Sequence, residues 1–208
     1  MRYTYLFLKR LFDMICSLLG LIVSAPLWLI VALGIEISDP GPVFYIAKRT
    51  TKDDRVFDMY KFRSMRQGKA NESVFRGDED RIFPFGAFIR ATKLDELPQL
   101  LNILIGDMSI VGPRPLMQRY LAFYTEEERR RHLVRPGLTG YAQVHGRNTV
   151  SWDDRIAQDL YYVDHVSFSL DLSILVKTIL LVLKREGTSN DDMENFDDYR
   201  KRQWAMKQ

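Results

Sequence analysis

The 208-residue sequence contains a single cysteine, and this scarcity excludes two kinds of structural site. Cys16 has no second cysteine for a disulfide within the chain, and one thiolate does not build a thiolate metal site. His132, His145 and His165 lack a metal-ligand spacing such as HxxxH. The patterns GxxxxGK[ST], GxSxG and GxGxxG are also missing, so the common nucleotide-loop and hydrolase classes are excluded.

The charge balance is only mildly basic. The formal net charge is +3 and the sequence pI is near 8.9. Such a balance suits an anionic membrane surface or a phosphate-bearing ligand, and it is too weak to argue for nucleic acid. The length favours one domain with appendages.

One long apolar run lies near the N-terminus, between Asp13 and Glu36. Its 22 residues, Met14 to Ile35, carry no charge. As a helix they would extend about 33 Å, against a hydrocarbon core of ~30 Å. The run is longer than the core of a signal peptide, so we expect a retained membrane element.

The orientation of this element is ambiguous, because basic residues flank both of its ends. Lys9 and Arg10 precede the run, Lys48 and Arg49 follow it, and Pro26 interrupts it. Since proline removes a backbone donor and bends or breaks a helix, Pro26 is consistent with a re-entrant helical hairpin on one side of the bilayer. An ordinary kinked transmembrane helix is the alternative on these grounds.

The remaining patterns predict short strands followed by helices. A β-hairpin is expected from strands within 38–49 and 55–65, joined by a turn at 50–54. Helices are expected at 92–109, ending at Gly106, and at 152–167 and 170–187, the last of them interfacial. The segment 125–148 is expected to be a charged helix that runs into a glycine-punctuated loop. The acidic and basic tail is expected to be solvated and mobile.

These patterns define a fold class and three regions. The class is α+β, mainly helical, with a re-entrant membrane helix broken at Pro26, a small β-hairpin and amphipathic interfacial helices. The expected regions are the membrane helix at 1–37, a cytoplasmic catalytic domain at 38–187 and a charged tail at 188–208.

Asp95 and Glu96 are the first candidates for chemistry. On a helix, adjacent side chains lie about 100° apart, so the two acids cannot act on one atom in the same way. One can be a nucleophile towards phosphorus while the other holds a proton or shares a cation. Acids are also common in the first turn of a helix, where they only offset its dipole.

Basic residues in separate segments strengthen the catalytic interpretation. Arg114 in "GPRP", Arg147 in "HGRN" and Arg90 in "FIRATKLDE" can together clamp a diphosphate, although each alone is typical of a surface ion pair. Lys61 and Arg63 in "YKFRSM" add two cations, or form the solvent face of a strand.

The segment "DED" at 78–80 matches the Asp-x-Asp pattern with which some glycosyltransferases bind a divalent cation. It lies in a very polar stretch without a hydrophobic strand before it, which favours a solvated loop.

Together these segments resemble the monotopic phosphoglycosyl transferases, the bacterial sugar transferase family. The resemblance covers roughly residues 5–187. It rests on "LKRLFD", the proline-interrupted apolar run, "YKFRSM", "IRATKLDELPQLLNILIGDMSIVGPRP", "VRPGLTGYAQVHGRN" and "YYVDHVSFSLDL". The short chain is similar to the minimal branch, which includes the diacetylbacillosamine-phosphate transferases. The family often has Ser-Pro at the membrane break, where this chain has Ala25-Pro26.

The resemblance implies a reaction. Such enzymes transfer a sugar 1-phosphate from a UDP-sugar to polyprenol phosphate and release UMP. By this resemblance Asp95 is the nucleophile that forms an aspartyl-phosphosugar intermediate, Glu96 is its partner, and Mg²⁺ bridges Asp95 and the diphosphate. Asp171 matches a family position without an assignable role. The candidate substrate-binding residues are Lys61, Arg63, Arg90, Arg114 and Arg147.

The resemblance also implies a location and partners. The site is expected on the cytoplasmic face of the bacterial inner membrane, in contact with lipids, with an N-acetylated sugar as the first expectation and downstream glycosyltransferases as further partners. Two alternatives stay open: a non-catalytic membrane-anchored protein that binds a nucleotide sugar or lipid phosphate, and a metal-dependent glycosyltransferase that uses "DED" and releases UDP.

Overall fold

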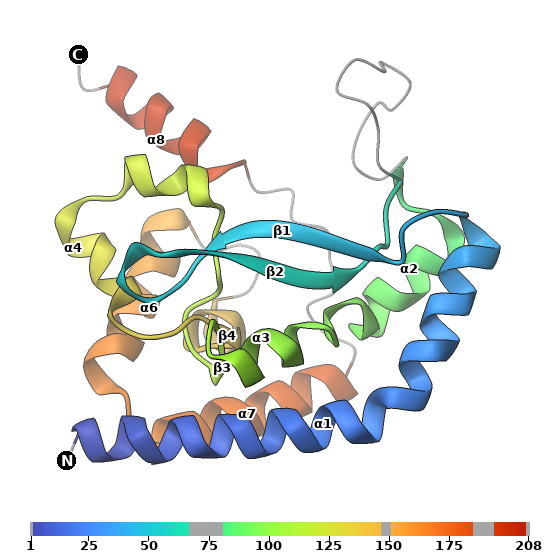
Figure 1. The fold of residues 1–208 in the computed structure, drawn as a ribbon. Coiled ribbons are helices and arrows are strands. Elements are labelled where there is room, and N and C mark those ends of the chain that lie inside the picture. The colour runs from blue at the N-terminus through green and yellow to red at the C-terminus, as the bar shows by residue number, and fades with distance from the viewer. Residues whose placement is uncertain (1, 67–80, 147–150, 185–193, 207–208) are drawn as a thin grey trace.

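The computed structural model describes residues 2–66, 81–146, 151–184 and 194–206, and most of them are helical (Figure 1). The helices are α1 (Arg2–Ser38), α2 (Pro84–Ala91), α3 (Gln99–Ile105), α4 (Glu126–Arg129), α5 (Tyr141–His145), α6 (Trp152–His165), α7 (Phe168–Leu183) and α8 (Phe196–Ala205). The strands are β1 (Phe44–Thr50), β2 (Val56–Phe62), β3 (Ser109–Val111) and β4 (Gly137–Thr139). Short 3₁₀ turns are η1 (Lys52–Asp54), η3 (Leu94–Glu96), η4 (Gln118–Phe123) and η5 (Arg130–Leu133).

The N-terminal helix α1 stays helical through Pro26. Figure 1 shows that α1 changes direction along its length, first running beside α7 and then turning towards α2. The predicted break at Pro26 is therefore not found. The proline is accommodated within one bent helix, as is common where a proline removes one backbone hydrogen bond. The re-entrant path through the membrane stays a prediction.

Ser24 does not compensate for the donor that Pro26 removes. Its hydroxyl lies 3.5 Å from the Leu21 carbonyl oxygen and accepts a hydrogen bond of 3.1 Å from the Trp28 indole N–H. The affected carbonyl is that of Ile22, four residues before the proline. The serine thus links two turns of α1 on either side of Pro26.

The first half of α1 is anchored to the rest of the fold by polar side chains. Asp13 is buried and accepts hydrogen bonds from the Ser109 hydroxyl at 2.7 Å and the Ile110 N–H at 3.0 Å. Arg10 donates to the carbonyl oxygens of Ile103 and Leu104 at 2.5 and 2.8 Å, in the last turn of α3. Basic donors at this position satisfy carbonyls that a helix end leaves without a partner.

Asp171 joins α1 to α6 and α7. Its carboxylate accepts hydrogen bonds from the Tyr5 hydroxyl at 2.5 Å, the Lys9 ammonium at 2.5 Å and the Tyr162 hydroxyl at 2.7 Å. Only 6% of the Asp171 surface is exposed. This family-matched residue therefore has a structural position, between the N-terminus of α1 and the helices near the end of the chain.

The outer surfaces of α1 and α7 are strongly apolar. Residues 4–38 form the one helix, among the described residues, that is long and apolar enough to cross a membrane. Only 11% of its most apolar window is buried, unlike the core helix of a soluble protein. The exposed apolar residues include Phe7 and Val23 of α1 and Phe168 and Leu183 of α7. We conclude that the protein is anchored to a membrane.

The β-hairpin predicted from the sequence is confirmed. β1 and β2 are antiparallel, with Tyr45 opposite Lys61 and Arg49 opposite Phe57. Because side chains alternate between the faces of a strand, one face of the hairpin packs against α3 through a cluster of buried residues. That cluster contains Ala47, Phe57, Met59, Ile103 and Met108.

A small parallel pair, β3 and β4, was not predicted, and it fixes the start of the "GPRP" segment. A Cβ atom on Gly112 would lie 2.3 Å from the Arg135 carbonyl oxygen, and one on Gly137 would lie 2.1 Å from the Gly112 nitrogen. Only glycine fits such a close approach of two backbones. The charged helix expected at the start of 125–148 is present only as the short α4 and the 3₁₀ turn η5, and the glycine-punctuated loop expected after it contains β4 and α5.

The expectation of a solvated C-terminal end is wrong for Phe196–Ala205, which forms α8. Phe196 is fully buried in a cluster with Tyr120, Tyr124, Trp152 and Ile156. Phe196 lies within a segment of many acidic and basic residues. Because the prediction considered only these charges, it missed the contact of Phe196 with the core. The helices expected around 152–167 and 170–187 are confirmed as α6 and α7.

Candidate active site

The candidate acids lie in a turn between two helices. Lys93 adopts a left-handed conformation with φ 58°, and Leu94–Glu96 then forms a single 3₁₀ turn. The sequence predicted that the helix already included 92–98, but α3 begins only at Gln99, behind Pro98. Its end at Gly106 is as predicted. In a 3₁₀ turn successive side chains point about 120° apart, so Asp95 and Glu96 face different neighbours.

Glu96 is paired with Lys61. The Lys61 ammonium donates to a Glu96 carboxylate oxygen at 2.8 Å. Lys61 is the next-to-last residue of β2. Burial on its own raises the pKa of Glu96, but Lys61 and Arg114 outweigh it and lower the pKa to about 2. Glu96 is therefore ionised near neutral pH and does not hold a proton there.

Asp95 has the opposite electrostatic character. Burial raises the pKa of Asp95 above its usual value, and the charge of Glu96 adds to this shift, while Lys61 and Arg90 oppose it. Only 7% of its surface is exposed, and its Oδ1 atom is buried without a hydrogen-bond partner in the described part of the chain. Because buried carboxylate oxygens are nearly always paired, this atom is available to a ligand.

The same oxygen provides a test for a metal ion. No group of three or more His, Cys, Asp or Glu side chains that could hold a metal occurs among the described residues. Mg²⁺, however, is commonly held by one or two carboxylates together with substrate phosphates and water. Asp95 could be such a carboxylate ligand, since no donor in the described structure competes for its Oδ1 atom.

Two of the predicted arginines lie near the acids. Arg90 is exposed on α2 and lowers the pKa of Asp95, whereas Arg114 is exposed in "GPRP" and lowers that of Glu96. No described residue hydrogen bonds with the Arg114 guanidinium. Lys61, Arg90 and Arg114 are thus the cations of the predicted set whose charges act on the acidic pair.

Arg63 has other partners. Its guanidinium donates to the Asp39 carboxylate and carbonyl and, at 2.6 Å, to the Pro42 carbonyl oxygen. It also lies over the Phe83 ring, 5.4 Å from the centroid. These bonds fix the chain after α1, so a substrate phosphate would have to compete with them. Arg147 and the "DED" segment at 78–80 lie outside the described residues.

The sequence missed a buried pair that fixes the Arg114 loop. Arg131 donates to the Asp159 carboxylate at 2.6 Å and to the Arg114 carbonyl oxygen at 2.9 Å, and 2% of its surface is exposed. Arg131 lies in a run of three arginines, a pattern that is typical of a solvent-exposed surface. Its partner Asp159 lies 28 residues away in the sequence, so only the folded structure shows that Arg131 is a positioning residue.

Comparison with known proteins places these residues within one matched region. The family described as "Bacterial sugar transferase" matches residues 4–185. An uncharacterized sugar transferase, EpsL of Bacillus subtilis (strain 168), is 43% identical over 180 residues, with 86% of this chain and 89% of the relative covered.

Two further relatives have names that state a reaction. The undecaprenyl-phosphate galactose phosphotransferase of Salmonella typhimurium is 39% identical, covering 87% of this chain and 41% of that protein. The UDP-N-acetylgalactosamine-undecaprenyl-phosphate N-acetylgalactosaminephosphotransferase of Aeromonas hydrophila is 40% identical, covering 88% of this chain and 45% of that protein. The chain thus spans less than half the length of these two relatives and most of EpsL.

Proposed function

Because this chain belongs to the bacterial sugar transferase family, we propose that it transfers a sugar 1-phosphate from a UDP-sugar to polyprenol phosphate, which in bacteria is undecaprenyl phosphate. The products would be a polyprenyl-diphospho-sugar and UMP. One observation carries the proposal beyond the family: Asp95 is buried with one carboxylate oxygen unpaired in the described structure, and the positive charges of Lys61, Arg90 and Lys93 act on it.

The first step joins Asp95 to phosphorus. An Asp95 carboxylate oxygen attacks the β-phosphorus of the donor, and the bond between that phosphorus and the bridging oxygen breaks. The bridging oxygen keeps the electron pair and leaves as part of UMP, so the sugar phosphate stays on Asp95 as an acyl phosphate. In the second step an oxygen of polyprenol phosphate attacks the same phosphorus and releases the carboxylate.

Glu96 supports this chemistry as a permanent anion. A pKa of about 2 leaves Glu96 ionised near neutral pH, so it has no proton to donate there, and of the two roles expected for it, sharing a cation is favoured. It holds the Lys61 ammonium at 2.8 Å, beside the place where the donor phosphates approach Asp95. Lys61, Arg90 and Arg114 then offset the repulsion between the anionic nucleophile and the anionic substrates.

We also propose Mg²⁺ as cofactor, with Asp95 as its protein ligand and the donor diphosphate supplying further oxygens. When bound, it would neutralise charge on the diphosphate and favour departure of UMP. Among the described residues, the unpaired Oδ1 of Asp95 supports this assignment.

The membrane surface brings the two substrates together. We propose that α1 enters and leaves the bilayer on the cytoplasmic side of the bacterial inner membrane, and that α7 lies at the interface. The exposed apolar residues on both helices support this placement. The soluble donor would then arrive from the cytoplasm and the lipid acceptor from the bilayer, and the product would pass to downstream glycosyltransferases.

The sugar is proposed only as a class. Two relatives are named for galactose and N-acetylgalactosamine, whereas the predicted likeness to diacetylbacillosamine transferases has no support among them. A hexose or N-acetylhexosamine attached to UDP is the substrate class that follows.

The decisive experiment traps the intermediate. The full chain in detergent or nanodiscs is incubated with Mg²⁺ and a panel of UDP-sugars without acceptor, and intact mass is measured with UMP release. We expect a sugar-phosphate adduct on wild type and on Asp53→Asn, and none on Asp95→Asn. Asp53 is a suitable control, because it is exposed and its left-handed backbone, φ 59°, tolerates asparagine.

The outcome also separates the alternatives. Release of UDP instead of UMP would indicate a glycosyltransferase, and nucleotide binding without release would indicate a non-catalytic binding protein. Turnover that survives Asp95→Asn would remove the nucleophile assignment.

A further inference from the structure

One face of the β-hairpin connects the acidic pair to a second group of cations. Tyr45 and Arg49 of β1 lie on the same face as Lys61 of β2, because Tyr45 pairs with Lys61 and side chains alternate along a strand. Ala47 and Met59, which are buried against α3, lie between the two ends of this face. Lys61 holds Glu96 at one end of this face. Arg49 lies four residues farther along β1, or about 13 Å at ~3.3 Å per residue.

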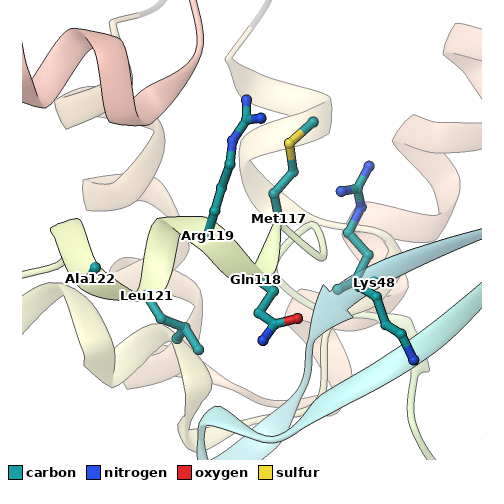
Figure 2. A pocket seen from close by; sticks show the side chains of 7 residues that line it. Lys48, Met117, Gln118, Arg119, Leu121 and Ala122 are labelled. Atoms are coloured by element: carbon teal, nitrogen blue, oxygen red, sulfur yellow. The ribbon is translucent and has the colours of Figure 1, made fainter. Parts of the chain in front are cut away.

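Arg49 lines an open hollow between β1 and η4, shown in Figure 2. The hollow measures about 570 Å³ and is lined by Lys48, Arg49, Met117, Gln118, Arg119, Leu121 and Ala122. We refer to it as the Arg49 hollow. Its two walls are held together by the backbone, since Arg49 pairs with Met117 and the Thr50 N–H donates to the Leu116 carbonyl oxygen at 3.1 Å. The wall at Met117 directly follows the "GPRP" segment.

The cations in this hollow differ in how they are neutralised. Lys48 lies 2.6 Å from the Asp58 carboxylate, and Arg119 lies 3.4 Å from that of Asp197. Arg49 is half-buried, and no described acidic residue forms an ion pair with it. Its burial lowers the pKa of Arg49, and the nearby charge of Arg114 lowers it further. A half-buried guanidinium beside a second one is stabilised by an anion placed between them.

The position of the hollow favours the soluble substrate. Figure 1 shows β1 on the side of the fold away from α1 and α7, which carry the exposed apolar residues. The hairpin meets the second half of α1 at its other end, where Phe44 lies 6.0 Å from the Trp28 ring. An anion that enters beside Arg49 therefore comes from the aqueous side.

We propose that Arg49 is a donor-binding residue: with Arg114 it holds the nucleotide phosphate that becomes UMP, and the nucleoside lies in the Arg49 hollow. This inference rests on the proposed function. It extends the site through the "GPRP" segment, which carries Arg114 and is followed by the pairing of Met117 with Arg49, so the phosphate under attack lies near Asp95 and the departing phosphate towards Arg49. When the bridging bond breaks, the departing phosphate gains negative charge, and the two guanidinium groups stabilise it.

The test measures UMP binding at equilibrium, in the absence of turnover. Calorimetry would use the full chain in nanodiscs with Mg²⁺, comparing wild type with Arg49→Gln, Arg49→Lys and Arg55→Gln. Arg55 is a matched control, because it is an exposed arginine of the same hairpin that does not line the hollow. Thermal unfolding of each variant verifies that it is folded.

We expect Arg49→Gln to weaken UMP binding by about 10- to 100-fold, the loss typical of one hydrogen bond to a charged group. Arg49→Lys keeps the charge without the bidentate fork, so its loss should be smaller. Arg55→Gln should change the affinity less than about twofold, because screening weakens exposed charges outside the site. In steady-state assays the KM for the UDP-sugar should rise in Arg49→Gln while that for undecaprenyl phosphate stays unchanged.

Two results would overturn this inference alone. UMP affinity of folded Arg49→Gln within twofold of wild type would show that Arg49 does not hold the nucleotide. A rise in KM for undecaprenyl phosphate only would assign the hollow to the lipid phosphate. Failure of the wild type to release UMP from any UDP-sugar would instead reject the proposed function itself.

Discussion

Asp95 and Asp171 are buried to nearly the same degree, with 7% and 6% of their surfaces exposed, yet their surroundings differ completely. Asp171 accepts three hydrogen bonds, from two tyrosines and a lysine of α1 and α6. Asp95 keeps one oxygen unpaired among the described residues and lies beside a second carboxylate. A saturated buried carboxylate stabilises a fold, whereas an unsaturated one is available for a ligand. Burial alone therefore does not distinguish these two carboxylates.

The largest expected effect comes from Asp95→Asn. UMP release should fall at least about a thousandfold, because the proposed nucleophile is removed. The melting temperature should stay the same or rise, since the change relieves an unpaired buried charge. Calorimetric melting and UMP assays of the same preparation measure both. A marked fall in melting temperature would place Asp95 in the same structural class as Asp171.

Lys61→Gln should produce the next largest effect, a fall in turnover of about a hundredfold at neutral pH, by loss of one preorganised cation. It should also shift the pH profile. Lys61 lowers the pKa values of Asp95 and Glu96, so its removal raises both. Asp95 then becomes protonated at higher pH, and the acid limb of kcat/KM moves to higher pH. An acid limb that stays in place would contradict the assigned coupling.

Asp171→Leu reverses the pattern of Asp95→Asn. It leaves the buried Lys9 ammonium without its partner, 2.5 Å away in the native protein, and should destabilise the fold by about 3 kcal/mol. Thermal unfolding in detergent measures this loss. Turnover per folded molecule should change little, since Asp171 touches no residue of the acidic pair. Loss of turnover in a fully folded variant would indicate a catalytic role that the contacts do not show.

The smallest effect on chemistry is expected from Pro26→Leu, which restores one backbone donor in α1. If Pro26 sets the re-entrant path, the straightened helix should span the bilayer. In a Cys16→Ala background, the thiol introduced by Lys52→Cys would then react with an impermeant thiol reagent from the periplasmic side. Labelling from the cytoplasmic side only, in both the variant and its parent, would contradict this role of Pro26.

Local patterns in the sequence were sufficient for several elements. The alternation around residues 44–62 predicted the hairpin, and Gly106 predicted the end of α3. The apolar period predicted α7. The choice of Asp95 and Glu96 as the chemical pair stays a prediction. These features depend on neighbours within a few residues, which a sequence displays directly.

The tertiary structure alone decided which charged groups meet. Lys61 bonds to Glu96, 35 residues away in the sequence, and Tyr5 bonds to Asp171, 166 residues away. Arg63 bonds to Asp39. Phe196 is buried and attaches α8 to the core. The sequence determined the chemical groups and the local turns of this protein. Only folding decided which charges were saturated and which, like the Asp95 Oδ1 atom, have no partner among the described residues, because the partners of a charge are set by packing between distant segments.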